Sequence, residues 1–168
     1  QSMELVEKMY KEVLTKTFGK SIFTIGQFED IDINQKWGKI DYVDTIKQAF
    51  DIDVSEASEQ ELRDKINSIG IDGNKIIGKG RLMDTLWKQV RKTIKGPAFL
   101  INQPVEISPL AKRKENDRSK TEKYQIMIAG SELGNGYTEL NDPIDQASRF
   151  AEQAKLREEG DVEAQMHD

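Results

Sequence analysis

The sequence predicts an α+β fold in which helices flank an antiparallel sheet. Apolar residues recur at three- and four-residue spacing over residues 3–18 and again within residues 40–96, as they do along amphipathic helices. Elsewhere they form short runs bounded by glycine, proline and charged residues, which is typical of strands. With 168 residues and 36% hydrophobic content, the chain has the size of one domain with one core.

The amino-terminal segment is expected to contain a helix followed by a hairpin. The helical spacing predicts a helix from Met3 to Phe18, and Gly19 should end it. Residues 21–33 then alternate apolar and polar positions on both sides of a glycine, which predicts two short strands around a turn. We expect residues 1–39 to form one segment of the fold.

Residues 40–96 are expected to form a helical insertion. Asp41 can cap a first helix, and Ser58 with Glu61 makes a capping box ahead of a second helix. A third helix is expected over about residues 80–94, where a glycine-proline pair follows.

The remaining residues, 97–168, should supply the sheet and a closing helix. The closing helix is expected to begin after a cap at Asn141 or Asp142 and to run to Glu159. Three strands should pair in one antiparallel sheet, near residues 98–107, 123–130 and 136–140.

Composition excludes several kinds of chemistry. The chain has no cysteine, and its single histidine is His167, so it cannot build a zinc-thiolate site, a disulfide or a Ser-His-Asp triad. A net charge of -5 argues against a wholesale electrostatic hold on nucleic acid or on an anionic membrane. No apolar run approaches the roughly 20 residues of a membrane span, and the first residues lack the form of a signal peptide. We therefore expect a cytoplasmic protein with no membrane partner.

Polar side chains in a glycine-rich segment form the best candidate for a small-molecule site. Asn135, Tyr137 and Glu139 would point to the same face of a regular strand. An amide, an aromatic ring and a carboxylate on one face can hold a small cation, and Glu132 lies in the same segment. The alternative is a glycine-rich hairpin whose polar side chains face water. These glycines do not form a phosphate-binding loop, because the GxxxxGK[ST] pattern is absent.

Two phrases of the sequence resemble class II lysyl-tRNA synthetases. PVEISPLAKR at residues 104–113 and GSELGNGYTELNDPIDQ at residues 130–146 occur in the order and separation of that family, and residues 149–164 resemble its continuation. The resemblance covers almost all of this chain but only part of a synthetase. It implies a catalytic-domain region between motif 2 and motif 3 of the class II antiparallel sheet, with residues 40–96 matching a helical insertion.

The resemblance also implies roles for particular residues. Glu132 matches a carboxylate of the Mg2+ and ATP site, whereas Asn135, Tyr137 and Glu139 match the lysine pocket. A second metal carboxylate usually stands seven residues before Glu132, where this chain has Gln125, a neutral side chain that offers one carbonyl oxygen and no charge. We expect Glu139 to be the buried carboxylate that faces the lysine ε-ammonium, because a neutral competitor would leave it unpaired.

The function implied by the resemblance is that of a lysine-tRNA ligase. Such an enzyme activates L-lysine with ATP to lysyl-adenylate, transfers it to tRNA(Lys), uses Mg2+ and works as a homodimer. Because the arginines expected to hold the phosphates belong to the missing motifs, the 168 residues alone are expected to be inactive.

Two alternatives remain open at this point. One is a lysine ligase that acts on a protein, as the elongation-factor P lysine ligases do, although these tend to have alanine where Gly134 stands. The other is a non-catalytic lysine-binding fragment built on the same fold. Aspartyl and asparaginyl synthetases share the fold, but residues 132–142 resemble the lysyl type.

Overall fold

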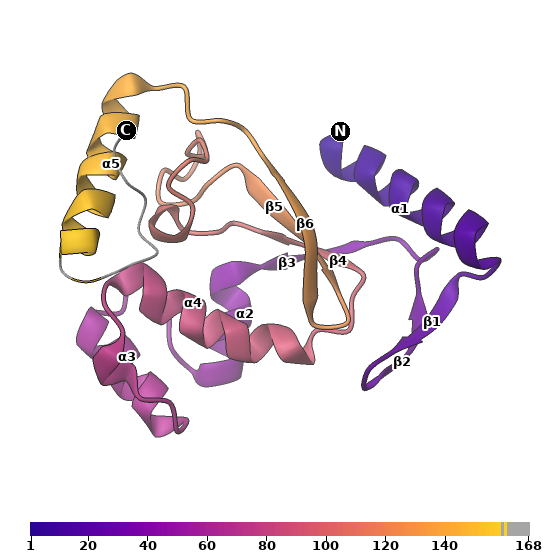
Figure 1. The fold of residues 1–168 in the computed structure, drawn as a ribbon, viewed down its shortest axis with the longest axis horizontal. Coiled ribbons are helices and arrows are strands. Elements are labelled where there is room, and N and C mark those ends of the chain that lie inside the picture. The colour runs from indigo at the N-terminus through magenta and orange to yellow at the C-terminus, as the bar shows by residue number, and fades with distance from the viewer. Residues whose placement is uncertain (159, 161–168) are drawn as a thin grey trace.

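The computed structural model of the chain describes residues 1–158 and 160 (Figure 1). Its helices are α1 (Ser2–Phe18), α2 (Tyr42–Phe50), α3 (Glu59–Ser68), α4 (Lys79–Val90) and α5 (Pro143–Glu158), with short 3-10 turns η1 (Gly73–Lys75), η2 (Arg91–Thr93) and η3 (Val105–Ile107). Its strands are β1 (Ile22–Ile25), β2 (Phe28–Asp32), β3 (Gly38–Asp41), β4 (Ala98–Ile101), β5 (Lys123–Ile128) and β6 (Ser131–Tyr137). The α+β class is therefore confirmed, while the expected helix end at Glu159 and the residue His167 lie outside the described residues.

The main sheet has four strands in the order β3-β4-β5-β6, and β1 pairs with β2 in a separate antiparallel hairpin. The antiparallel pairing predicted for the three expected strands is confirmed for β4, β5 and β6. A fourth strand that was not predicted, β3, lies parallel to β4, so the sheet as a whole is mixed. The strand was missed because its four residues contain one large apolar side chain, Ile40. β3 also spans the predicted boundary between residues 39 and 40, and the division into three segments stays a prediction.

The predicted ends of two strands are wrong for reasons of backbone geometry. β4 stops at Ile101, because Asn102 adopts a positive φ of 60° and the chain turns into η3. β6 begins directly after β5, because Ala129 and Gly130 both have positive φ and form a two-residue turn between them. The strand expected at residues 136–140 therefore runs from Ser131 to Tyr137.

Helix starts follow the side chains that the sequence offered as caps. Asp41 accepts hydrogen bonds from two backbone N–H groups in the first turn of α2, and Ser58 with Glu61 forms the complete capping box of α3. At α5 the cap is Asp142, whose carboxylate accepts from two backbone N–H groups. α4 ends at Val90 instead of residue 94, because the chain tightens into η2.

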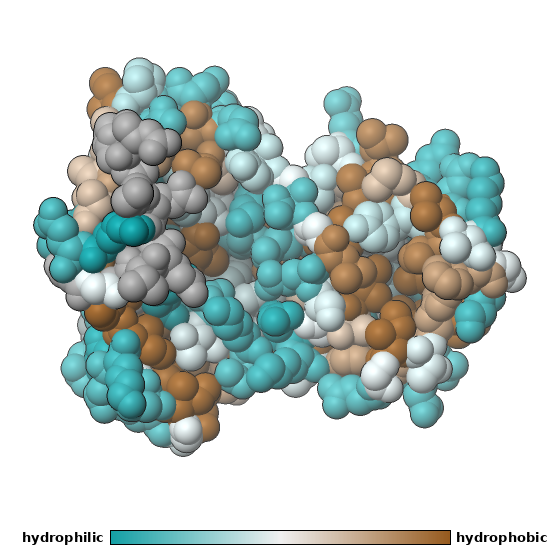
Figure 2. Space-filling model, viewed as in Figure 1, coloured by the Kyte–Doolittle hydropathy of each residue, from teal (hydrophilic) through white to brown (hydrophobic). Residues whose placement is uncertain are grey.

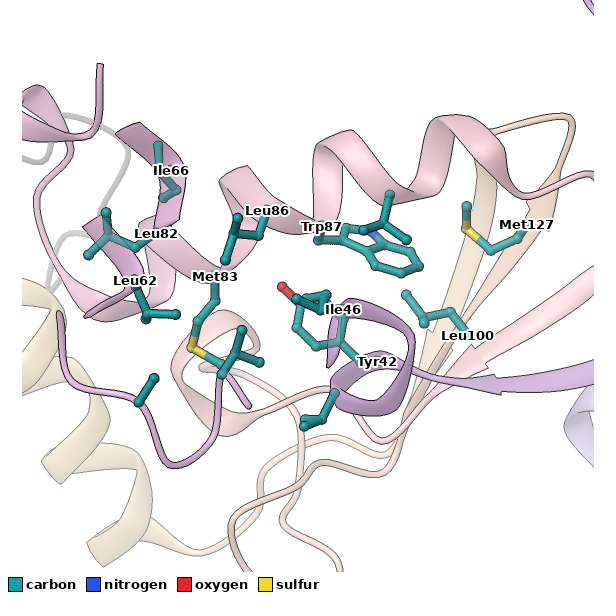
Figure 3. Packing of buried hydrophobic residues seen from close by; sticks show 14 residues of the cluster. Tyr42, Ile46, Leu62, Ile66, Leu82, Met83, Leu86, Trp87, Leu100 and Met127 are labelled. Carbon is teal, nitrogen blue, oxygen red and sulfur yellow. The ribbon is translucent and has the colours of Figure 1, made fainter. Parts of the chain in front are cut away.

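The sheet separates two apolar clusters, so the molecule has three layers (Figure 1). On one side α2, α3 and α4 pack on the sheet through Leu100 and Met127, which contact the cluster that contains Tyr42 and Trp87 (Figure 3). On the other side α1 and the β1–β2 hairpin cover Phe99, Ile126 and Ile128, among others. Neighbouring residues of a strand face opposite layers, as the pleat requires.

An apolar stripe on α1 stays exposed. Figure 2 shows apolar side chains gathered over α1 and the β1–β2 hairpin. The exposed apolar residues are Leu5, Met9, Val13 and Phe18 on α1 and Ile22 and Ile25 on β1. The spacing of Leu5, Met9 and Val13 along α1 places them away from the side of the helix that packs against the sheet. In the described part of the chain, no helix combines the length and the apolar content needed to cross a membrane.

The Tyr42 hydroxyl is buried without a hydrogen-bond partner among the described residues. Its ring lies 5.2 Å from the ring of Trp87, and burial, with the nearby carboxylates of Asp84 and Glu132, raises the pKa of Tyr42 well above its usual value. An unsatisfied buried hydroxyl costs about 1–3 kcal/mol. We therefore expect Tyr42→Phe to raise the free energy of unfolding by roughly 1 kcal/mol in urea denaturation. A loss of stability would show that the hydroxyl has a partner.

Candidate functional site

The candidate site lies on the helix-covered face of the sheet, where β5 and β6 extend beyond the helices. Met127 is fully buried against the helical cluster, whereas Gln125 and Lys123, which follow it on the same face, are only partly buried. The register of β6 then brings further side chains to this face, through the cross-strand pairs Met127 with Glu132, Gln125 with Asn135, and Lys123 with Tyr137. The structure thus brings Gln125, Glu132, Asn135 and Tyr137 to one face. Strand alternation predicts this for Asn135 and Tyr137, whereas Glu132 reaches the same face because the register shifts between Ile126 and Met127.

Hydrogen bonds to both carboxylate oxygens fix the position of Glu132. The indole Nε1 of Trp87 donates to Oε1 at 2.8 Å, and the amide Nε2 of Gln125 donates to Oε2 at 3.1 Å. The Nε of Arg91 lies 4.0 Å from Oε1. Two elements that are distant in sequence, α4 and β5, therefore orient one acidic group at the edge of the helical layer.

The surroundings of Glu132 bear on the metal site that the sequence predicts. Gln125 turns its NH2 group toward Glu132, while its carbonyl oxygen accepts from Nε2 of Gln103 at 3.0 Å. Within residues 1–158, no three His, Asp or Glu side chains lie close enough together to hold a metal ion. Mg2+ is usually held by one or two carboxylates together with substrate phosphates. Glu132 fits a cation that arrives with a nucleotide, whereas Gln125 turns its NH2 group toward Glu132 and its carbonyl oxygen toward Gln103.

A pocket of about 170 Å³ opens beside these strands. Residues 107–111 form one wall, and Lys123, Asn135 and Tyr137 form the other. Glu139 lies next to this wall, because its backbone pairs with Ala111 in an isolated antiparallel bridge. Asn135, Tyr137 and Glu139 are all exposed, so the expectation of a buried carboxylate at Glu139 is wrong for this chain. Neither the helices nor the loops of the described residues cover this end of the sheet.

Sequence reasoning missed four side chains of the site: Trp87, Gln103, Ser108 and Lys123. The Lys123 ammonium donates to the hydroxyl of Ser108 at 3.3 Å. Burial lowers the pKa of Lys123, and the carboxylates of Glu132 and Asp84 oppose this shift. Strand alternation could have found Lys123, which precedes Gln125 by two residues. Gln103 and Ser108 depend on the turn after β4, which has no periodic signal.

An arginine from α5 holds the pocket wall in place. Arg149 is 5% exposed and donates to the backbone carbonyls of Ser108, Pro109 and Ala111. Its guanidinium also pairs with Asp145 at 2.9 Å, and Asp145 pairs in addition with Arg113 at 2.9 Å. This cluster satisfies three carbonyls that no helix or strand uses, so it determines the shape of the wall.

The same cluster predicts how stability depends on pH. Hydrogen bonds from Arg149 and Arg113 outweigh burial and lower the pKa of Asp145 to about 2. Because this pKa lies below that of an unfolded aspartate, about 3.9, the stabilisation is complete above that value and is lost as the pH falls through about 2. We expect Asp145→Asn to lower the melting temperature at pH 7. We also expect it to reduce the difference between the melting temperatures at pH 7 and at pH 2. An unchanged difference in melting temperature would contradict the role of Asp145 in the pH dependence of stability.

Two glycines of β6 have different reasons for their small size. A Cβ at Gly136 would lie 2.6 Å from the ring of Tyr124, its cross-strand neighbour, so the strand needs glycine there. A Cβ at Gly134 would meet Ile126 at 3.4 Å and the Tyr10 hydroxyl at 3.5 Å, which is ordinary contact on the α1 side of the sheet. Alanine would fit at position 134 without entering the pocket.

A comparison with known protein families gives a match over almost the whole chain. A family model described as "tRNA synthetases class II (D, K and N)" matches residues 1–167. The chain belongs to this family.

The similar curated proteins are lysine-tRNA ligases. The chain is 39% identical over 166 residues to the lysine-tRNA ligase of Thermosipho africanus, which is 99% of this chain and 33% of the relative. It is also 39% identical to that of Thermotoga maritima over the same shares, and 36% identical to that of Oceanobacillus iheyensis, over 99% of this chain and 34% of the relative. This class II synthetase chain therefore spans about a third of the length of these relatives.

Proposed function

We propose that the chain is part of a lysine-tRNA ligase, which activates L-lysine with ATP to lysyl-adenylate and transfers the lysyl group to tRNA(Lys). The observation that carries the proposal is a pocket lined by Asn135 and Tyr137 near the oriented carboxylate of Glu132, with the backbone of Glu139 paired to Ala111 of the pocket wall. The lysine-tRNA ligases at 39% identity support the choice of amino acid. ATP, lysine and tRNA(Lys) are the proposed substrates, and Mg2+ is the proposed metal.

Each residue of the pocket can contribute to the recognition of lysine. A carboxylate at Glu139 pairs with the ε-ammonium, and the aromatic ring of Tyr137 can pack on the aliphatic part of the substrate. The amide of Asn135 can accept or donate one hydrogen bond. Aspartate and asparagine, the other amino acids of the family description, have no side-chain cation that could pair with Glu139. The acidic group thus favours lysine over these two.

Adenylate formation needs binding and electrostatics more than a protein nucleophile. The lysine carboxylate attacks the α-phosphorus of ATP, a new P–O bond forms, and the bond to pyrophosphate breaks. Mg2+ at Glu132 would neutralise phosphate charge. Glu132 would hold this cation at a fixed position, because Trp87 and Gln125 keep its carboxylate oriented. We propose no role for Gln125 as a ligand.

Further features of the whole enzyme are carried over from the resemblance. We propose that it acts in the cytoplasm as a homodimer. Residues 1–39 and 97–168 would then belong to the catalytic domain, and residues 40–96 to the helical insertion.

Charging assays test the proposal and separate it from its alternatives. The complete protein should attach radiolabelled lysine to tRNA(Lys), whereas the 168 residues alone should form no lysyl-adenylate. The reason is that the arginines expected to hold the phosphates lie outside this chain. Transfer of lysine to a protein acceptor instead of tRNA would favour the protein-ligase alternative. Thermal stabilisation by lysine without adenylate formation would favour the binding fragment.

A further inference from the structure

We propose that Gln103 and Gln125 are positioning residues that orient the Glu132 carboxylate through one directed chain of side-chain hydrogen bonds. The chain runs from Ser108 to Gln103, then to Gln125 and finally to Glu132. Its effect on catalysis rests on the proposed function, because it concerns the group proposed to face Mg2+ and ATP. The chain itself stands on the geometry alone.

The carboxylate at the end of the chain determines the direction of every link. An ionised carboxylate only accepts hydrogen bonds, so Gln125 must turn its NH2 group toward Glu132 and its carbonyl oxygen toward Gln103. Gln103 must then donate its own NH2 group, which leaves its carbonyl oxygen to accept from the Ser108 hydroxyl at 3.3 Å. The Lys123 ammonium supplies the hydrogen bond that Ser108 accepts. Reversing any amide would place two donors or two acceptors face to face.

The link between Gln125 and Glu132 is exposed, but buried residues hold it on both sides. Gln103 is 2% exposed and Ser108 is 4% exposed, and the Thr121 hydroxyl also donates to the backbone carbonyl of Gln103. On the other side of Glu132, Trp87 is 2% exposed and its ring lies 5.2 Å from Tyr42. Because buried polar side chains with every partner in place have one favourable arrangement, the carboxylate is held from both sides.

The arrangement has a consequence for the site. A carboxylate has about four lone-pair directions, and Trp87 and Gln125 occupy one on each oxygen of Glu132. The remaining directions are free for a cation, and they are fixed before the cation arrives. Gln125 therefore acts through Glu132, since its NH2 group faces Glu132 and its carbonyl oxygen faces Gln103.

Two substitutions of equal kind test this series of hydrogen bonds in the complete protein. Gln125→Met and Gln103→Met keep side-chain length and remove the amide. Gln125 contacts Glu132 directly, whereas Gln103 is separated from Glu132 by one further hydrogen bond. Gln60→Met is the matched control, because the Gln60 amide also donates to a carboxylate, that of Asp64, but on the exposed side of α3. If Gln103 orients Gln125, removing the Gln103 amide must also change the orientation of the Glu132 carboxylate.

The first measurement is the indole N–H resonance of Trp87, in protein that carries 15N-labelled tryptophan. Trp87→Phe assigns the resonance. Trp37, whose indole donates to the carbonyl of Ile33 in the opposite apolar cluster, reports whether the fold is intact. We expect the Trp87 resonance to move in Gln125→Met and in Gln103→Met, with the Trp37 resonance unchanged, and neither to move in Gln60→Met.

The second measurement is lysine-dependent ATP-pyrophosphate exchange. We expect both chain variants to lower kcat/KM for ATP about tenfold or more, with the KM for lysine changed by less than about twofold. A Trp87 resonance that stays in place in either variant, or Gln103→Met exchange equal to that of Gln60→Met, would overturn the proposal. Absence of exchange in the unmodified protein would instead contradict the proposed function. The Trp87 resonance would still decide whether the hydrogen bonds from Ser108 to Glu132 are connected.

Discussion

Replacing Glu139 with glutamine is expected to lower kcat/KM for lysine by about one to two decades in the complete protein. Glutamine has nearly the same shape as glutamate, so the change removes the charge opposite the lysine ammonium and little else. A hydrogen bond to a charged group is worth about 1.5–3 kcal/mol, and each 1.4 kcal/mol is about tenfold. This range suits a carboxylate that is exposed in the chain itself. Amino-acid activation at varied lysine concentration measures the effect.

The matched control for this change is Glu152→Gln on the exposed side of α5. It should alter kcat/KM for lysine by less than about twofold, because exposed charges contribute little. The KM for ATP should stay near its original value in both variants. If Glu139→Gln behaved as Glu152→Gln does, the assignment of the lysine pocket would be wrong and the polar hairpin would be the better interpretation.

Arg149→Met is expected to lower the free energy of unfolding by about 3–5 kcal/mol. Its removal leaves the Asp145 carboxylate with Arg113 alone and takes the Arg149 donor away from the carbonyls of Pro109 and Ala111. The Ser108 carbonyl keeps its hydrogen bond from the Ala111 N–H. Urea denaturation of the chain at pH 7 measures the loss. Because the same carbonyls belong to the pocket wall, the complete protein should also show a raised KM for lysine.

Arg118→Met provides the comparison for this prediction. The side chain of Arg118 is exposed, and only its backbone carbonyl is used, as the acceptor of a hydrogen bond from Arg113. We expect its substitution to change stability by less than about 0.5 kcal/mol. Equal stability of the two variants would mean that Arg149 does not hold the wall.

Local signals allowed much of the fold to be predicted from the sequence. The caps at Asp41, Ser58 and Asp142 lie where their side chains satisfy free backbone N–H groups, which is a property of a few adjacent residues. The parallel pairing of β3 with β4 could not be predicted in this way. It joins residues about sixty positions apart, and β3 has almost no pattern of its own.

The candidate site shows the same division between local and distant information. Asn135 and Tyr137 share a face because strands alternate, and this was predictable. The exposure of Glu139 depends on what covers the end of the sheet, which alternation does not specify. The hydrogen bond from Trp87 to Glu132 joins α4 to β6, and no spacing in the sequence predicts it.

Selection of lysine by this site can be measured as exchange of pyrophosphate into ATP by the complete protein. Each of the twenty amino acids is supplied in turn with ATP and Mg2+, and labelled ATP is counted. We expect lysine to support exchange far above every other amino acid, and we expect Glu139→Gln to remove most of this preference. Exchange driven by aspartate or asparagine, or exchange with lysine that survives Glu139→Gln unchanged, would contradict the selection of lysine by this site.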